Sequence, residues 1–173
     1  MELKQMGMKH LLTMMALTLA MASCSTLTSA QRAEREAKKE KAVAKALAER
    51  RYTVDVNMMY PRSGRAQNVT SDYSLEVRGD SLVSYLPYFG RAYNVPFGGG
   101  KGLNFAAPIK SYHSEKGKKG NTRVEIQVDN TEDYFTYSLD IFPDGNTTID
   151  VVARERESIT FSGQMDIDED NLK

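Results

Sequence analysis

The sequence predicts a mainly β protein, either an antiparallel β-sandwich or a small barrel, with one N-terminal α-helix. From Tyr52 onward, apolar and polar residues alternate with a period of two, which is the period of a strand with one buried face. Residues that favour turns, such as Gly, Pro, Asn and Asp, separate these segments. Only residues 30–51 have a helical pattern. Short strands joined by turns, without a second helix, are typical of a curled antiparallel sheet.

An apolar run ends at Cys24, the only cysteine of the chain. Residues 11–24 read LLTMMALTLAMASC, and about a dozen apolar residues match the core of a signal peptide, whereas a membrane-spanning helix needs roughly 20. Two small residues before the cysteine resemble the lipobox of bacterial lipoproteins, although Met21 stands where the commonest lipobox has Leu. We therefore expect residues 1–23 to be a lipoprotein signal peptide and Cys24 to be lipidated. The alternative is an ordinary cleaved signal peptide that leaves a free thiol.

The residues after the cysteine bear on the location of the mature protein. Ser25–Ser29 contains no acidic residue, whereas signals for inner-membrane retention and for surface export tend to be acidic at this place. By this resemblance we expect the protein in the cell envelope, on the periplasmic face of an outer membrane. Its membrane partner is the bilayer itself, through acyl chains that contribute about 0.8 kcal/mol per buried CH₂ group.

Composition limits the remaining function classes. The chain balances 23 basic against 23 acidic residues, so no general field attracts nucleic acid, and we expect no nucleic-acid partner. A single cysteine excludes an internal disulfide, so stability must come from an apolar core without Trp.

Residues 24–51 are expected to form a lipid-anchored polar lead followed by a charged helix. The helix, over residues 30–51, is rich in Ala, Glu, Lys and Arg and lacks Gly and Pro. Thr28 and Gln31 have the spacing of a capping box. Its basic residues allow two interpretations, a solvated spacer or a contact with anionic lipid head groups near the anchor.

The β domain is expected over residues 52–166, followed by an acidic tail over residues 167–173. Arg78-Gly79-Asp80 indicates a hairpin, and Pro143-Asp144-Gly145-Asn146 a tight turn. Residues 112–122, YHSEKGKKGNT, are interpreted as a mobile basic loop. The alternating pattern predicts strands at 52–60, 73–77, 81–85, 123–128, 134–142, 147–153 and 158–165.

Residues 79–82 spell GDSL, the signature of a family of serine esterases. That chemistry needs a base to accept the serine proton, which the family supplies as a late Asp-x-x-His. The only histidine after the signal peptide is His113, and Lys110 stands three residues before it. We therefore interpret the GDSL residues as hairpin sequence.

No sequence pattern indicates a cofactor or a metal. Gly98-Gly99-Gly100-Lys101-Gly102 brings a phosphate loop to mind, but Gly102 stands where the Walker motif needs Ser or Thr. No His, Cys or carboxylate set has zinc spacing, and the acidic residues from Asp166 onward are more typical of a solvated tail than of a calcium loop.

The densest unusual segment is Leu86-Pro87-Tyr88-Phe89-Gly90-Arg91-Ala92-Tyr93. Aromatic residues together with arginine are typical of a recognition surface, but the same composition also suits a strand that crosses the core. Both interpretations stay open. The candidate binding residues are Tyr88, Phe89, Arg91, Tyr93, Gly98, Gly99 and Gly100.

Together with the lipobox, four segments of the chain resemble a family of bacterial lipoproteins known as domain of unknown function 4251. They are the segment above, Gly102-Leu103-Asn104-Phe105, Phe142-Pro143-Asp144-Gly145 and Ile159-Thr160-Phe161-Ser162-Gly163. The similarity covers residues 40–166 and implies an exported single domain without an assigned active site. We expect a non-catalytic module that faces the periplasm and binds an envelope protein, glycan or lipid. The alternatives are a self-associating structural envelope protein and a hydrolase with a carboxylate pair among Asp55, Asp72 and Glu76.

Overall fold

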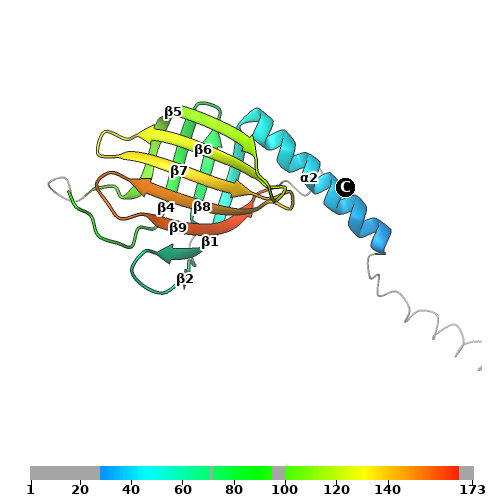
Figure 1. The fold of residues 1–173 in the computed structure, drawn as a ribbon, viewed down its shortest axis with the longest axis horizontal. Helices are drawn as coiled ribbons and strands as arrows, with labels where there is room; N and C mark the ends of the chain where they lie inside the picture. The colour runs from blue at the N-terminus through cyan, green and yellow to red at the C-terminus, as the bar shows by residue number, and fades with distance from the viewer. Residues whose placement is uncertain (1–27, 71, 95–99, 168–173) are drawn as a thin grey trace, which may run out of the picture. The chain divides into compact units, whose positions relative to one another are not determined.

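The computed structural model describes residues 28–70, 72–94 and 100–167 (Figure 1). The predicted signal peptide and Cys24 lie outside the described residues. In the described part of the chain the helix is α2 (Ser29–Glu49). The strands are β1 (Arg51–Pro61), β2 (Gln67–Asn68), β3 (Ser74–Arg78), β4 (Ser81–Leu86), β5 (Leu103–Lys116), β6 (Thr122–Asp129), β7 (Tyr134–Ile141), β8 (Asn146–Ala153) and β9 (Ile159–Met165).

The chain divides into two units, residues 1–34 and residues 35–173. In the first unit, Thr28 and Gln31 form the predicted capping box. The Thr28 amide donates to Gln31 Oε1 at 2.9 Å, and the Gln31 amide donates to Thr28 Oγ1 at 3.4 Å. Two amides at the start of the helix thereby find partners that the helix itself cannot supply. No helix in the described part of the chain is long and apolar enough to span a bilayer.

In the second unit the strands form an antiparallel barrel. Strand β1 pairs with β3, each later strand pairs with the next, and β9 pairs with β1 to close the circle of eight strands (Figure 1). Among the described strands, the short strand β2 pairs only with the second half of β1. Of the two predicted architectures, the protein therefore adopts the barrel. Closure leaves these eight strands without a free edge.

The inward faces of the strands make one apolar core. Side chains alternate between buried and accessible along β3, β6, β7 and β9, as the period-two pattern predicts. A barrel of about eight strands is just wide enough for its side chains to fill the interior. The largest fully buried side chains are those of Tyr137, Phe135 and Phe161. The Tyr137 hydroxyl donates to Ser84 Oγ at 3.1 Å, so this buried polar group has a partner.

Helix α2 ends earlier than residue 51, where the sequence predicts it to end. Arg50 has a φ of +50°, a left-handed conformation that cannot continue a helix, and β1 begins at the next residue. The Arg50 amide donates to the Leu47 carbonyl at 3.2 Å, and the Arg50 carbonyl accepts from the Gly79 amide at 2.7 Å. Val43 of the helix is buried in the core cluster of the barrel.

The prediction of a mobile basic loop over residues 112–122 is wrong. Its first five residues belong to β5, whose first half pairs with β4 and whose second half pairs with β6. The register shifts between Ile109 and Ser111, which marks a bulge or similar irregularity where the strand changes partners. Backbone pairing holds the exposed, polar second half of β5 in the sheet. Because this half is polar, it lacks the apolar alternation by which a strand is predicted from sequence.

The predicted turns are confirmed. Arg78 pairs with Ser81 across a two-residue hairpin loop, in which Gly79 has a φ of +62°, as a type II′ turn requires at its first position. Gly145 has a φ of +82° in the turn that joins β7 to β8. Just after β9, the Asp166 amide donates to the Thr53 carbonyl of β1 at 2.9 Å.

Closure of the barrel depends on one glycine. Opposite Gly163 of β9 the register shifts between Val56 and Met58 of β1. A Cβ atom at Gly163 would lie 2.0 Å from the Asp55 carbonyl oxygen and 3.0 Å from the Val56 Cα atom. Because both neighbours are backbone, a side chain at residue 163 forces the two strands apart.

We expect Gly163→Ala to lower the free energy of unfolding by about 3 kcal/mol, because overpacking here displaces backbone rather than a side chain. Urea denaturation measures the change. The control is Gly79→Ala, where a Cβ atom meets nothing within 4 Å and only the positive φ costs about 1 kcal/mol. Equal losses in the two variants would contradict the role of Gly163 in closure.

Candidate functional site

The predicted aromatic segment lies at the end of the barrel where β4 leaves and β5 begins. It runs beside the connection between β8 and β9, and Ala92 forms an isolated antiparallel bridge with Arg156. The Tyr93 amide donates to the Glu155 carbonyl at 2.7 Å, and the Arg91 carbonyl accepts from the Glu157 amide at 2.9 Å. Backbone pairing therefore holds residues 91–93 against the barrel end.

The Tyr88 side chain also holds this segment in place. Its side chain is half-buried, and its hydroxyl lies 2.8 Å from the Arg91 carbonyl and 3.1 Å from the Glu157 carbonyl, both of which accept. Burial is the main cause that raises the pKa of Tyr88, so the hydroxyl remains a donor at neutral pH. Gly90 allows this arrangement, because a Cβ atom there would lie 2.9 Å from the Tyr88 hydroxyl oxygen.

The remaining candidate side chains of this segment face solvent. Phe89 is 54 % exposed and Tyr93 is 67 % exposed, and Arg91 is exposed as well. These three residues are therefore not part of the core, whereas Tyr88 packs against it. Of the candidate glycines, Gly100 lies beside the segment, and Gly98 and Gly99 lie outside the described residues.

A pocket of about 300 Å³ opens beside the segment. Apolar side chains, the backbone of the loop that leads into β5, and one buried cation surround it. Gly102 has a φ of +64°, and a Cβ atom there would lie 3.8 Å from both the Arg156 Nη1 atom and the Tyr88 Cβ atom. The lining residues are Leu86, Tyr88, Ala92, Gly100, Lys101, Gly102, Leu103 and Arg156.

The buried cation of this pocket, Arg156, pairs with Asp133. The Arg156 Nε atom donates to Asp133 Oδ2 at 3.2 Å, and their side chains are 6 % and 0 % exposed. Asp133 also accepts from the backbone amides of Tyr134, Arg154 and Glu155 at distances from 2.7 to 3.3 Å. The carboxylate therefore ties the β6–β7 connection to the segment after β8.

The terminal nitrogens of Arg156 are the chemically available part of this ion pair. They make no hydrogen bond to another described residue, since Asp133 contacts only the Nε atom. Arg156 is itself one of the residues that line the pocket. The guanidinium also lies over the Tyr88 ring, 5.3 Å from its centre. The pocket thus offers charge-assisted donors beside an aromatic wall.

Neither member of this pair carries a signal in the sequence that predicts a site. Arg156 stands in the charged run Arg154–Glu157 between two strands, which reads as a solvated turn. Asp133 ends a polar connection in the same way. Each gives the local signal of an exposed loop residue, because only the assembled barrel end brings the two together and excludes water from them.

The other chemistry-bearing residues do not gather around this pocket. Ser81 of the GDSL signature begins β4 in the hairpin, and His113 on β5 lies 3.8 Å from Glu115 in an exposed pair. Burial, followed by the negative charges of Asp166 and Asp72, raises the pKa of Asp55. Glu76 is bound by the Arg78 guanidinium. In the described part of the chain, no group of three His, Cys, Asp or Glu residues could hold a metal ion.

The fold and the site define a class of protein, a closed antiparallel barrel with one N-terminal helix and a charged pocket at one barrel end. Residues 34–165 match the family described as a domain of unknown function (DUF4251), and the chain belongs to this family, as the sequence predicts. A DUF4251 family protein from Bacteroides eggerthii DSM 20697 has a similar fold in a crystal structure. The TM-score is 0.57 at 19 % identity, over 76 % of this chain and 89 % of that chain. The search of curated proteins finds no match.

We expect Asp133→Ala to lower the free energy of unfolding by about 3–5 kcal/mol, because it leaves the Arg156 charge buried without its partner. Chemical denaturation measures the loss. The control is Glu132→Ala, which removes a neighbouring carboxylate that accepts from the exposed Lys101 amide, and it should cost less than about 1 kcal/mol. Adding Arg156→Met to Asp133→Ala should recover part of the loss. If Asp133→Ala costs no more than Glu132→Ala, and adding Arg156→Met recovers no stability, the ion pair is not the source of stability.

Proposed function

We propose that the protein is a non-catalytic binding module of the cell envelope, anchored through Cys24 and facing the periplasm at the outer membrane. The observation that carries the binding role is the exposure of Phe89 and Tyr93 on a segment that backbone hydrogen bonds hold beside the Arg156 pocket. Large apolar side chains in water cost free energy unless a partner covers them. Rigid attachment lowers the entropic cost of binding.

The chemistry of this surface favours a protein component of the envelope as the partner. Aromatic side chains with arginine are the residues that contribute most binding energy at protein interfaces. The two rings would pack on an apolar patch of the partner. A carboxylate or a carbonyl of the partner, at the pocket, would accept from the Arg156 nitrogens, which makes the complex a combination of apolar burial and charge-assisted hydrogen bonds.

We expect the double variant Phe89→Ser, Tyr93→Ser to lose at least about tenfold in partner capture, because truncation of central aromatic residues removes most of the binding energy. Capture is measured by pull-down from solubilised envelopes. Both side chains face solvent, so the melting temperature should stay near that of the unaltered protein.

The matched control is Val152→Ser on β8, where the side chain is 54 % exposed, as Phe89 is. A photo-crosslinking residue in place of Tyr93 should couple to one discrete species, whereas the same residue in place of Val152 should not. The crosslinked species is then identified as a protein, a glycan, a lipid or a second copy of this chain. Equal capture by both serine variants would refute the proposed surface.

We expect Cys24→Ala to release the protein from the membrane fraction, because lipidation needs the cysteine thiol. Fractionation after alkaline washing and incorporation of labelled palmitate measure the two effects. Ser25→Ala, one residue later, should leave both unchanged. A Cys24→Ala protein that stays membrane-bound would contradict lipid anchoring at this residue.

A further inference from the structure

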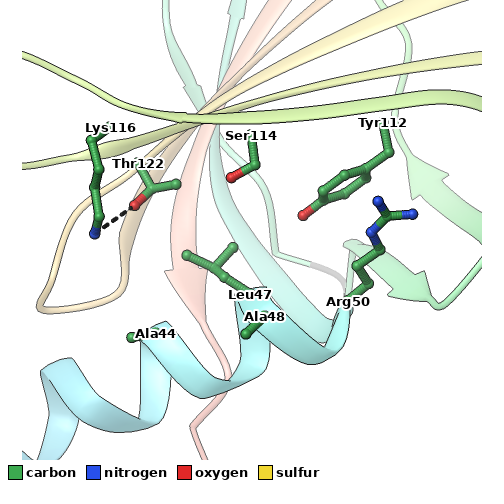
Figure 2. A pocket seen from close by; sticks show the side chains of 8 residues that line it. All are labelled: Ala44, Leu47, Ala48, Arg50, Tyr112, Ser114, Lys116 and Thr122. Atoms are coloured by element: carbon green, nitrogen blue, oxygen red, sulfur yellow. Dashed lines mark hydrogen bonds between the residues drawn. The ribbon is translucent and has the colours of Figure 1, made fainter.

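A second pocket, of about 450 Å³, lies at the opposite end of the barrel, between helix α2 and strand β5 (Figure 2). The last turns of the helix form one wall, and Tyr112, Ser114 and Lys116 of β5 form the other. These three residues share the inward face of the sheet, because Tyr112 and Ser114 pair with Ile126 and Val124, which are fully buried. The pocket is therefore a space between the barrel end and the helix that packs against it.

The helical wall of this pocket is apolar and built from small side chains. Figure 2 shows Leu47 directed toward the strand wall, and Ala44 and Ala48 of the same helix also line the pocket. Leu47 packs against the core, whereas Ala44 and Ala48 remain exposed. Larger side chains at these two residues would occupy the space, so the two alanines are what keep the pocket open.

Two cations stand on either side of this apolar wall. Figure 2 shows Arg50 next to Tyr112 and Lys116 next to Thr122, with Leu47 and Ser114 between them. The Arg50 guanidinium lies 4.4 Å from the centre of the Tyr112 ring, and the Lys116 Nζ atom donates to Thr122 Oγ1 at 3.3 Å.

The charge of the pocket is positive. None of its described lining residues is acidic. The nearest carboxylate to Arg50, that of Asp80, is almost fully exposed at 3.9 Å, and such an exposed pair contributes little. Burial is the main cause that raises the pKa of Tyr52 and of Tyr112, whose hydroxyls lie 3.3 Å apart, so both remain neutral. The charge of the pocket lining thus comes from Arg50 and Lys116.

We propose that this pocket binds a single-chain amphiphile with an anionic head group, a carboxylate or a phosphate. The chain packs on Ala44, Leu47 and Ala48, and the head group accepts hydrogen bonds from the Arg50 or the Lys116 side chain. A volume of about 450 Å³ is within the range of small-ligand sites. The proposal does not depend on the proposed function, which concerns the other end of the barrel.

Isothermal titration of the purified protein with decanoate, decyl phosphate and decanol tests the head group. We expect both anions, or the one whose head group the site accepts, to bind at least about tenfold more tightly than decanol, since a charged acceptor strengthens each hydrogen bond. The double variant Arg50→Gln, Lys116→Gln should abolish this preference. The control double variant Lys41→Gln, Lys45→Gln also removes two positive charges, but from helix residues outside the pocket lining. It should keep the preference for the anionic probes. Equal binding of all three probes would overturn the proposal.

Filling the pocket tests its location. Ala48→Trp should abolish decanoate binding, because the indole occupies the space against β5. Ala37→Trp, at an exposed residue of the same helix outside the pocket lining, should bind as the unaltered protein does. Both alanines are exposed, and thermal melting checks that each variant folds. Unchanged decanoate affinity in a folded Ala48→Trp protein would place any binding elsewhere and refute the site.

Discussion

Closure of the sheet between β1 and β9 is the constraint on which the rest of the structure depends. It supplies the last row of backbone partners, so none of the eight barrel strands keeps a free edge. It also encloses the buried side chains that alternate with accessible ones along β3, β6, β7 and β9. Because Gly163 has no Cβ atom, β9 can pass the Asp55 carbonyl closely enough to complete the circle. Without this contact the same strands would form an open sheet with one exposed apolar face.

A closed barrel of consecutive antiparallel strands has two ends, and here the ends differ chemically. The hairpin loops β3–β4, β5–β6 and β7–β8 share the end that helix α2 contacts, where Arg50 and Lys116 border an amphipathic pocket. The other end contains the buried Asp133–Arg156 pair and the exposed aromatic segment. Asp133 accepts from three backbone amides and one guanidinium, so the charge pair also fixes the connections that support the segment. The Asp133–Arg156 pair therefore supplies both the buried charge at this end and the contacts that hold its connections in place.

Local sequence signals predicted the elements that local physics determines. The hairpin at Gly79 and the turn at Gly145 require positive φ angles, which glycine adopts without strain, and both occur where predicted. Strand β5 escaped prediction because its second half is polar and exposed, and Pro108 interrupts its first half. Its pairing with β4 and β6 makes it a strand, and the irregularity after Ile109 lets it serve both neighbours. Arg156 and Asp133 escaped prediction because each resembles a solvated loop residue.

The sequence by itself determined the fold class, the helix with its Thr28–Gln31 capping box, the turns and the family, since each depends on residues close together in the chain or on motifs. Only the tertiary structure decided that the β domain is a barrel rather than a sandwich, which charges are buried, and where the pockets lie. The physical reason is that closure pairs the first strand with the last, and the Asp133–Arg156 pair joins separate connections. Such contacts depend on the register of distant strands, which no local pattern specifies.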